Sequence, residues 1–442
     1  MSITAVSIDL KVEFAELFAA IADEPWALLL DSCEHPQSEY DFIFRQPEQT
    51  LTVNDNWPEQ LRQLQAQLPA YDGPATVPFR GGLAGAFSYD AGRALEHLPS
   101  QAERDIALPE VAVGLYSQAL IRCRKSGATW LVGRSDEITE LSAFWRKQLK
   151  QIKPGSKLFQ LNADWQSNMS RADYLQKFVR VQDYLHAGDC YQINLAQRFS
   201  APFSGDPWAA YLQLRAANQA PFSGFMRLSD GAILSHSPER FLHVSATGLV
   251  QTKPIKGTRP RGKDSQTDSA LAHELQHAAK DRAENVMIVD LLRNDLSRVC
   301  QPGSVQVPKL FAIESYPAVH HLVSTVEGQL ESSQQALELV AACFPGGSIT
   351  GAPKIRAMEI IDELEPHRRS FYCGSLGYIS QHGETDTNIA IRTLVACNHT
   401  IYCWAGGGLV VDSDGAAEYQ ETLDKVAKIL PVLSSTLEAD SA

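Results

Sequence analysis

Short apolar segments recur along this chain in pairs, and this pairing constrains the fold more than any other feature of the sequence. One pair flanks the turn Ser-Ala-Thr-Gly at 245–248, and the runs at 26–30 and 80–89 are further strand candidates among Pro/Gly-rich turns. Paired strands with alternating polar residues favour antiparallel or mixed sheets over a strict strand–helix–strand series. We therefore expect an α+β (mixed α/β) protein.

A polar stretch divides the chain into two parts. Residues 150–171 include Lys-Pro-Gly-Ser at 153–156, which is a linker composition. After it, longer helices are predicted at 171–186 and at 269–292. A last helix is predicted to start after the Ser-Asp-Gly cap at 413–415 and to run to Leu430, where Pro431 would end it. We expect an N-terminal domain over 1–155 and a second domain over 165–435, although 442 residues also suffice for one large intertwined core.

The composition excludes several classes of function. The net charge of −13 argues against nucleic acid or an anionic membrane as the general partner, although a local cationic pocket for a small anion is compatible with it. The N-terminus lacks the apolar core of a signal peptide, and no segment approaches 18 apolar residues. The eight cysteines form no Cys-x-x-Cys pair. We expect a cytoplasmic protein with reduced thiols and no zinc site.

The segment 252–262, Thr-Lys-Pro-Ile-Lys-Gly-Thr-Arg-Pro-Arg-Gly, places Lys256 between an apolar residue and a glycine turn. Partial burial and neighbouring cations lower the pKa of a lysine, which makes it an amine nucleophile at neutral pH. Glu239 lies just upstream, and the hairpin at 245–248 would set it near Lys256 as a general acid. The alternatives are a solvated basic loop and an ion pair of Glu239 with Arg240 or Arg259.

Two acidic pairs are candidates for binding a metal. Asp281 and Glu284 are three residues apart in one predicted helix, and Glu418 and Glu421 repeat this spacing in the last helix. Carboxylates supplied in ones and twos from separate helices suit Mg²⁺, which keeps several waters. The alternative for Glu421 is an ordinary surface ion pair with Lys425.

Two glycine-rich segments are candidates for anion binding. The segment 344–354 lacks the Gly-Lys-Ser/Thr of a phosphate loop, but Pro353 is suited to a helix start. The segment 405–411, Ala-Gly-Gly-Gly-Leu-Val-Val, reads as a second loop that lets backbone approach a ligand closely. Between them, Arg392 lies in a predicted strand and would clamp a carboxylate. The alternatives are tight turns and a solvated edge arginine.

Seven motifs occur in a fixed order over about residues 165–430. They are Ser-Pro-Glu-Arg-Phe (237–241), Pro-Ile-Lys-Gly-Thr-Arg-Pro-Arg-Gly (254–262), Ala-Glu-Asn-x4-Asp-Leu-x-Arg-Asn-Asp (283–295), His-Leu-Val-Ser (321–324), Gly-Ala-Pro-Lys (351–354), Gly-x-x-Gly-Tyr (374–378), and Ala-Gly-Gly-Gly (405–408) with Glu-Tyr-Gln-Glu-Thr (418–422). Together they resemble the chorismate-utilising enzymes, which include the large subunits of anthranilate and aminodeoxychorismate synthases and the isochorismate and salicylate synthases. The resemblance implies a fold like the anthranilate synthase large subunit, with two antiparallel-rich sheets packed as a sandwich and flanked by helices.

The resemblance also implies a role for each motif residue. Glu284 and Glu421 would hold Mg²⁺ against the ring carboxylate of chorismate, with Asp281 and Glu418 orienting ligands or waters. The enolpyruvyl carboxylate would be bound by Arg392, Tyr372, and the backbone of Gly406, Gly407 and Gly408. The ring would be lined by Gly257, Thr258, His321 and Ser348. A separate amino-acid pocket corresponds to Ser32, Ser38, Glu39, Tyr40, Pro221, Phe222 and Ser223, and its role stays open.

Lys256 separates the branches of the family. Anthranilate synthases carry alanine at this position, whereas a lysine is typical of the branch that aminates carbon 4 of chorismate on the route to 4-aminobenzoate and folate. The resemblance then implies that Lys256 attacks carbon 2 while Glu239 assists departure of the 4-hydroxyl, and that ammonia attacks carbon 4 and expels the lysine. The product would be 4-amino-4-deoxychorismate.

The source of ammonia lies outside the chain. No cysteine has the Gly-x-Cys-x-Gly setting of a glutaminase nucleophile, because Gly-Asp-Cys-Tyr at 188–191 lacks the second glycine. The resemblance implies a separate glutamine amidotransferase subunit, or use of free ammonia. The alternatives are an anthranilate synthase-like enzyme, an isochorismate synthase, and a catalytically silent scaffold for an amidotransferase.

Overall fold

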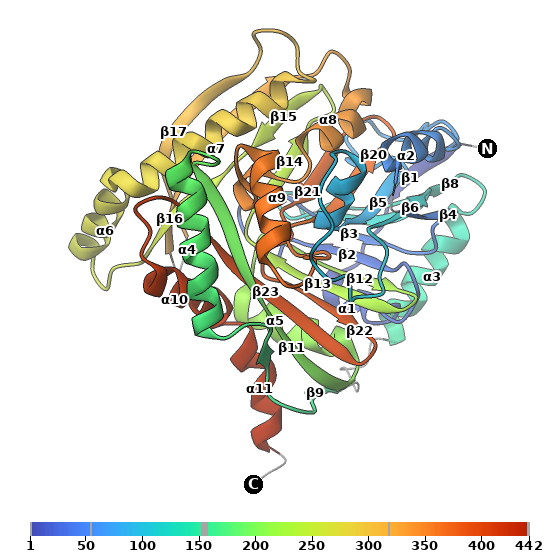
Figure 1. Ribbon diagram of the computed structural model, residues 1–442. Helices are drawn as coiled ribbons and strands as arrows, with labels where there is room; N and C mark the ends of the chain where they lie inside the picture. Colours follow the sequence, from blue (N-terminus) through green and yellow to red (C-terminus); the bar gives the residue numbers. More distant parts are fainter. Residues whose placement is uncertain (1, 54, 152–157, 317–318, 440–442) are drawn as a thin grey trace.

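The computed structural model describes residues 2–53, 55–151, 158–316 and 319–439 (Figure 1). The larger sheet has thirteen strands, in the order β1 (Ile3–Ser7), β8 (Thr129–Arg134), β7 (Ala119–Cys123), β3 (Tyr40–Phe44), β2 (Leu28–Asp31), β12 (Phe222–Leu228), β13 (Gly231–Ser237), β22 (Thr393–Cys397), β23 (Thr400–Leu409), β11 (Gln192–Gly205) and β10 (Gln166–Ser167), with β9 (Phe159–Leu161) and β19 (Gly351–Ala352) also paired to β11. The second sheet has ten strands, in the order β16 (Ile255–Pro260), β18 (Val319–Gln329), β15 (Leu249–Thr252), β14 (Arg240–Val244), β21 (Thr385–Asn388), β20 (Ser375–Ser380), β5 (Gly82–Phe87), β6 (Val111–Tyr116) and β4 (Gln49–Val53), with β17 (Gln306–Ser315) paired to β18. The strand pairings within both sheets are antiparallel, as expected.

Both sheets combine strands from the two parts of the sequence. β2 pairs with β12 in the larger sheet, and β5 pairs with β20 in the smaller one. Each sheet therefore contains strands from both sides of the predicted boundary. The linker residues Lys-Pro-Gly-Ser at 153–156 lie outside the described residues.

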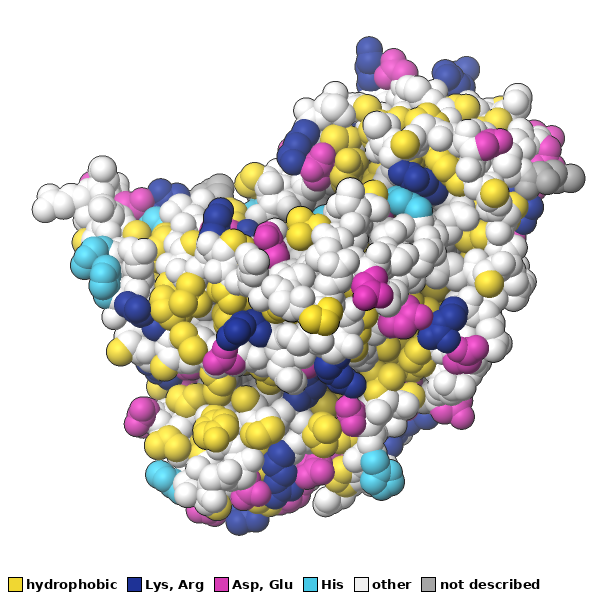
Figure 2. Space-filling view, turned by 90° about the horizontal axis from the view of Figure 1, so that it is seen from above, with side chains coloured by type: hydrophobic (Ala, Val, Ile, Leu, Met, Phe, Trp, Pro, Cys, Tyr) yellow, Lys and Arg dark blue, Asp and Glu magenta, His cyan; other side chains and the backbone are white. Residues whose placement is uncertain are grey.

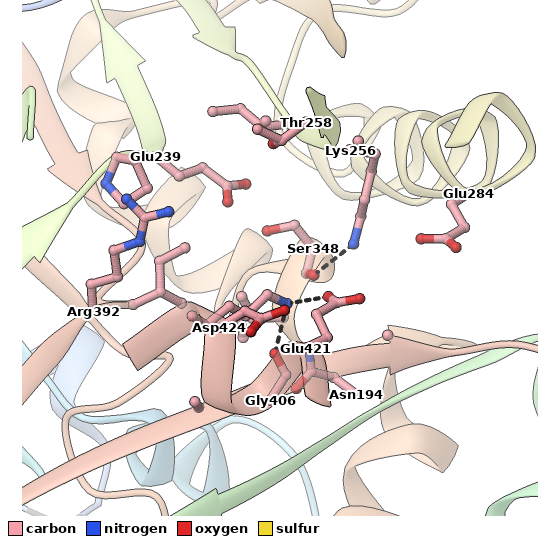
Figure 3. Close-up of a pocket in the computed structure, with 18 of the residues that line it drawn as sticks. Asn194, Glu239, Lys256, Thr258, Glu284, Ser348, Arg392, Gly406, Glu421 and Asp424 are labelled. Carbon is pink, nitrogen blue, oxygen red and sulfur yellow. Dashed lines mark hydrogen bonds and ion pairs between the residues drawn. The ribbon is translucent and has the colours of Figure 1, made fainter. Parts of the chain in front are cut away.

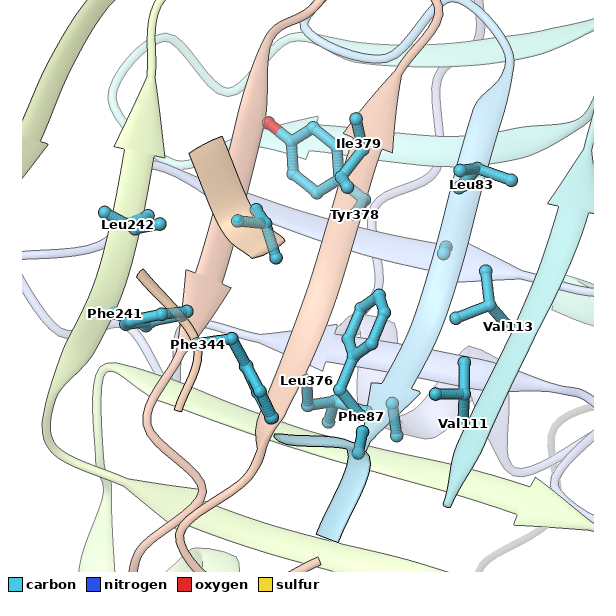
Figure 4. Packing of buried hydrophobic residues seen from close by; sticks show 14 of the residues in the cluster. Leu83, Phe87, Val111, Val113, Phe241, Leu242, Phe344, Leu376, Tyr378 and Ile379 are labelled. Carbon is cyan, nitrogen blue, oxygen red and sulfur yellow. The ribbon is translucent and has the colours of Figure 1, made fainter. Parts of the chain in front are cut away.

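The two sheets pack face to face through a large apolar core, as the predicted sandwich requires. Phe42 of β3 contacts Tyr378 of β20 with ring centroids 4.6 Å apart, and Phe44 lies 5.0 Å from Phe79. Figure 4 shows part of this core over the ten-stranded sheet, where Phe87, Leu376 and Phe344 lie among the strands. Large side chains that meet from both layers make each strand register dependent on the other sheet.

Helices cover the outer faces and ends of the sandwich. Their bounds are α1 (Phe14–Phe18), α2 (Trp57–Gln65), α3 (Ile138–Gln151), α4 (Arg171–Ala187), α5 (Pro207–Asn218), α6 (Ser265–His277), α7 (Ala279–Ser297), α8 (Ala336–Cys343), α9 (Lys354–Leu364), α10 (Gly415–Val426) and α11 (Leu430–Ala439), with 3₁₀ turns η1 (Tyr89–Ala94), η2 (Ser333–Gln335) and η3 (Gly347–Ile349). α1, α5 and α11 bury their apolar residues against the outer face of the thirteen-stranded sheet. No helix of the described chain combines the length and the apolar character needed to cross a bilayer.

Two predicted helices were wrong in extent. The helix expected at 269–292 is broken at Ala278, whose extended backbone (ψ 109°) separates α6 from α7. β16 packs into this break, because a Cβ on Gly257 would lie 2.8 Å from Cγ of Asp281 and 2.9 Å from Cδ1 of Leu275. Close tertiary packing thus overrides a sequence that has no local breaker.

The last helix ends at Val426, before the predicted Leu430, and Pro431 lies in the first turn of α11 instead of ending α10. Proline is tolerated in a first turn because its missing N–H would have no partner there. By contrast, α4 (Arg171–Ala187) agrees with the helix predicted at 171–186 and is followed by a left-handed Gly188. α10 begins after Asp414, which accepts a hydrogen bond from Ala417 N at 2.9 Å.

Candidate active site

A cavity of about 590 Å³ opens between the β16–α7 side of the molecule and the β23–α10 side (Figure 3). It is lined by Asn194, Pro238, Glu239, Ile255, Lys256, Gly257, Thr258, Arg259, Lys280, Asp281, Glu284, His321, Ser348, Ile349, Tyr372, Ile391, Arg392, Trp404, Ala405, Gly406, Gly408, Glu418, Glu421, Asp424 and Lys425. The cavity has the size of a small-molecule site and gathers charged groups of both signs. Five of the seven sequence motifs contribute to it.

Lys256 is aimed into this cavity by an irregularity in β16. The register with β18 shifts between Ile255 and Thr258, and Gly257 adopts a positive φ of 80°, which glycine tolerates best. The ammonium is partly buried and donates to the carbonyl oxygen of Ser348 at 3.3 Å. Burial lowers the pKa of Lys256, although the charges of Glu284 and Glu239 partly offset this. The lysine is therefore a better amine nucleophile than an exposed one.

Glu239 lies just before β14 and is only 7% exposed. Its backbone N–H donates to Oγ of Ser237 at 3.1 Å, and its carbonyl accepts from Ile389 N at 3.0 Å, so its position is fixed from both sides. Burial raises the pKa of Glu239 to about 7, against the opposing charge of Lys256. Arg240 and Arg259 are paired elsewhere, with Asp386 and Glu274. A carboxyl with this pKa can deliver a proton near neutral pH.

Five carboxylates line the cavity from α7 and α10, and four of them are the predicted metal candidates, since Asp424 of α10 is the fifth. α7 supplies Asp281 and Glu284, and α10 supplies Glu418 and Glu421. Burial raises the pKa of Glu284, with a smaller contribution from the charges of Glu418 and Asp281. The donors are all oxygens, which suits Mg²⁺.

No three His, Cys, Asp or Glu side chains within the described ranges come close enough to form a metal site by themselves. An ion held between α7 and α10 would therefore take further ligands from water or substrate, as Mg²⁺ does in many enzyme sites.

Two lysines pair with the carboxylates of α10. Lys280 Nζ lies 3.3 Å from Oε1 of Glu418, and Lys425 Nζ lies 2.7 Å from Oε1 of Glu421. The second contact is the surface ion pair considered as the alternative for Glu421, but Lys425 also donates to Gly406 O at 2.8 Å and both residues line the cavity. The pair thus belongs to the wall of the site.

Arg392 does not lie in a strand, in contrast to the prediction. It occupies the connection between β21 and β22 with a left-handed φ of 50°, and its carbonyl accepts from His236 N at 3.1 Å. This backbone turn brings the guanidinium to the cavity (Figure 3). Burial lowers the pKa of Arg392, which stays well within the charged range at neutral pH.

The glycine segment at 405–411 is also not a loop, because Gly406, Gly407 and Gly408 lie inside β23 opposite Ala196, Leu195 and Asn194 of β11. Gly406 and Gly408 line the cavity, whereas a Cβ on Gly407 would lie 3.2 Å from Oε2 of Glu418, on the α10 side. The missing side chains let α10 approach the strand closely. The predicted close approach is correct, although the element is a strand.

The remaining predicted residues also reach the cavity. Oγ1 of Thr258 lies 2.9 Å from Nδ1 of His321, and burial lowers the pKa of His321 to about 4, so its imidazole is neutral at physiological pH. Ser348 lies in η3, and the ring of Tyr372 stacks on Trp404 with centroids 6.0 Å apart. Together these groups add neutral polar and aromatic side chains to the cavity wall.

Comparison with known proteins identifies the class of site. Residues 26–431 match the family model described as chorismate binding enzyme. The chain belongs to this family. It is 52% identical to aminodeoxychorismate synthase component 1 of Escherichia coli K12, over 94% of this chain and 95% of that protein. It is 37% identical to anthranilate synthase component 1 of Thermus thermophilus, over 96% of this chain and 95% of that one.

A solved structure agrees. Anthranilate synthase component I from Streptococcus pneumoniae is 29% identical and superimposes with a TM-score of 0.79, covering 89% of this chain and 92% of that chain. The expected anthranilate synthase-like fold is therefore confirmed for this chorismate-binding enzyme. The sequence motifs had indicated the same family.

Some cavity residues of this chorismate-binding chain were missed from the sequence. Lys280, Asn194 and Trp404 line the cavity, but none belongs to a motif with an obvious chemical role. The sequence carried no signal for Lys280, because its place in the first turn of a helix depends on the break at Ala278, which has no local signal. Asn194 and Trp404 are placed by the pairing of β11 with β23, which local patterns do not specify.

Five of the seven residues expected to form an amino-acid pocket lie at another, smaller cavity of about 40 Å³. Ser38, Tyr40, Pro221, Phe222 and Ser223 line it. The other two contact side chains of this chain instead. Ser32 Oγ donates to Asp41 at 2.6 Å, and Glu39 pairs with Lys125 at 2.6 Å. The cavity lies between the β2–β3 segment and β12, where the early and late parts of this chorismate-binding chain meet.

Proposed function

We propose that the chain converts chorismate and ammonia to 4-amino-4-deoxychorismate and water, as the synthase component of an aminodeoxychorismate synthase. One observation carries this choice over an anthranilate synthase. Lys256, a partly desolvated amine, faces the cavity together with Glu239, whose pKa lies near 7. The 52% identity to a protein named for this activity, against 37% for one named anthranilate synthase, supports the same reading.

The reaction proceeds through the lysine in two allylic substitutions. The neutral Lys256 amine attacks carbon 2 of chorismate, the double bond shifts, and the 4-hydroxyl leaves as water with the proton of Glu239. The lysine nitrogen is then a secondary ammonium and Glu239 is a carboxylate. Ammonia attacks carbon 4, the double bond returns, and the carbon 2–nitrogen bond breaks, so that Lys256 leaves as its neutral amine. The Glu239 carboxylate takes one proton from the new ammonium at carbon 4, which restores both groups. Each step makes one C–N bond and shifts the double bond once. The two allylic shifts together direct the nitrogen of ammonia to carbon 4.

Burial supports both groups in these roles. It lowers the pKa of Lys256 so that the free amine is available, and it raises the pKa of Glu239 so that a proton is present near neutrality. The hydrogen bond from Lys256 to Ser348 O orients the amine, because a carbonyl acceptor leaves the nitrogen lone pair unused. The carbonyl therefore positions the nucleophile without quenching it.

Glu284 and Glu421 are proposed to hold Mg²⁺, with Asp281 and Glu418 orienting ligands or waters. When bound, the ion would neutralise the ring carboxylate and stabilise charge that shifts as the 4-hydroxyl departs. Arg392 is proposed to bind the enolpyruvyl carboxylate as a charged donor, beside Tyr372 and the β23 glycines. The site is thus built for a dianion at two separate ends.

We propose that ammonia reaches the site from a separate glutamine amidotransferase subunit. The relatives named as component 1 imply a second component, and no Gly-x-Cys-x-Gly segment occurs in this sequence. Free ammonium salts should replace the partner in vitro.

The proposal is tested by incubating the purified chain with chorismate, Mg²⁺ and an ammonium salt, and analysing products by chromatography and mass. An amino-chorismate that a 4-aminobenzoate-forming lyase consumes is the expected result. Formation of fluorescent anthranilate or of isochorismate would replace the proposal with one of those activities. Binding of an amidotransferase without any turnover would instead indicate a scaffold.

A further inference from the structure

Lys280 stands at a position that its own helix disfavours. It is the second residue of α7, and the preceding Ala278 provides no side-chain cap. The positive end of the helix dipole repels a cation there. A residue that breaks a local rule in this way needs a compensating interaction elsewhere.

The compensation comes from α10, on the opposite wall of the cavity. Lys280 Nζ reaches Oε1 of Glu418 at 3.3 Å, and Glu418 is only 3% exposed. The buried carboxylate thus keeps a cation in front of it.

The Lys280–Glu418 contact is looser than the contact that Lys425 makes with Glu421 within α10. The Lys280 side chain is 52% exposed, whereas Lys425 is held by Glu421 at 2.7 Å and by Gly406 O at 2.8 Å. Glu418 also accepts a shorter hydrogen bond, 2.6 Å, from Oγ of Ser413. The carboxylate would therefore keep its place if the Lys280 ammonium withdrew toward solvent.

The charges around the cavity indicate when the Lys280 ammonium would withdraw. Six carboxylates and five lysine or arginine side chains line it within the described residues. A divalent cation added beside them would meet a nearby ammonium that occupies one side of a carboxylate, and like charges at this range oppose each other. Binding of the ion and retention of the Lys280–Glu418 contact therefore compete.

We propose that Lys280 is a displaceable counter-ion: it neutralises Glu418 before the divalent cation binds and yields to that cation, so that it sets the metal affinity of the site. The inference rests on the Mg²⁺ role proposed above for the carboxylates of α7 and α10. Lys280 is a positioning residue in this account, because it acts through Glu418 and not on the reacting atoms.

The test is a titration of the full chain with Mn²⁺, an oxygen-preferring stand-in for Mg²⁺, followed by electron paramagnetic resonance without chorismate. Lys280→Gln should bind Mn²⁺ about three- to tenfold more tightly than the parent at low ionic strength, and the gain should shrink as salt is added. Lys280→Arg should restore the parent affinity. Lys147→Gln, which removes an exposed lysine of α3, controls for the loss of net charge.

A double-mutant cycle isolates the partner. If Lys280 acts through Glu418, Lys280→Gln should change the affinity by less than about twofold in a Glu418→Gln background. An equal gain in both backgrounds would show a general charge effect and overturn the proposed pairing. Unchanged or weaker binding by Lys280→Gln would overturn the proposal itself.

Failure of the metal assignment has a different signature. Glu284→Gln should weaken Mn²⁺ binding in both the parent and the Lys280→Gln protein. If neither protein binds Mn²⁺ in a Glu284-dependent way, the metal site and the counter-ion role are both wrong. The proposed amination of chorismate has its own test, the identity of the product, and can still hold.

Discussion

The ammonium of Lys256 donates a hydrogen bond to the backbone carbonyl of Ser348 at 3.3 Å. Ser348 belongs to η3, in the connection between α8 and α9, whereas Lys256 belongs to the irregular edge strand β16. Two segments far apart in sequence thus fix the nitrogen at one point of the cavity wall. The carboxyl of Glu239 lines the same cavity from a third segment.

Replacing Lys256 with alanine should abolish amination at carbon 4. Loss of a single catalytic group of this kind costs at least about 100-fold in rate, and any residual amination should occur at carbon 2, where ammonia attacks directly. Product analysis by mass and retention time measures both effects. Lys263→Ala, which removes an exposed lysine seven residues along, is the matched control and should behave as the parent.

Glu239→Gln should make the protein more stable than the parent above neutral pH. The pKa of Glu239 rises from 4.5 to about 7 on folding. Below pH 4.5 the carboxyl is protonated in both states and the protein has its full stability. As the pH rises through 7 the buried carboxyl must ionise, and the free energy of unfolding falls. The glutamine variant avoids this loss, which amounts to at most about 3 kcal/mol. Urea unfolding at about pH 5 and about pH 8 measures the difference. A difference between the two proteins that is the same at both pH values would contradict burial as the cause.

Removal of Glu421 should shift the Mg²⁺ dependence of turnover to much higher Mg²⁺ concentrations. In Glu421→Ala, the cavity keeps Glu284 but loses the α10 ligand, and metal affinity should fall by at least about 10- to 100-fold. Turnover measured against Mg²⁺ concentration reports this loss. Glu140→Ala removes an exposed carboxylate of α3 and should leave the curve in place. Identical curves for Glu421→Ala and the parent would exclude Glu421 as a ligand.

The buried pair Arg369–Glu365 should be important for stability. Arg369 is 1% exposed, donates to the carbonyl oxygens of Ile349 and Asn194, and pairs with Glu365 at 2.6 Å. Arg369→Met leaves Glu365 buried without its partner, which costs about 3–5 kcal/mol of unfolding free energy. Denaturant unfolding measures it. The exposed Arg180–Asp183 pair offers the contrast, since Arg180→Met should stay within about 0.5 kcal/mol.

Much of the candidate site was predictable because its chemistry is concentrated in short motifs. Lys256, Glu239 and the four helix carboxylates were each singled out by residue type and spacing, and all of them line one cavity. The antiparallel pairing was also predictable, because strand pairs with alternating polarity are a local pattern.

The features that the sequence did not reveal depend on contacts between distant segments. The break at Ala278 has no local signal and arises where Gly257 of β16 packs against Leu275 and Asp281. The three glycines at 406–408 read as a loop, yet pairing with β11 makes them a strand. Interleaving of the two sequence halves in both sheets likewise depends on pairings such as β2 with β12.

The most direct test of the account is the position of the new nitrogen. The purified chain is incubated with chorismate, Mg²⁺ and ¹⁵N-labelled ammonium, and the product is examined by nuclear magnetic resonance. The account predicts ¹⁵N bonded to carbon 4, in a product that forms with the parent and not with Lys256→Ala. Label on carbon 2 of the parent's product would contradict it and would make Lys256 a bystander in the cavity.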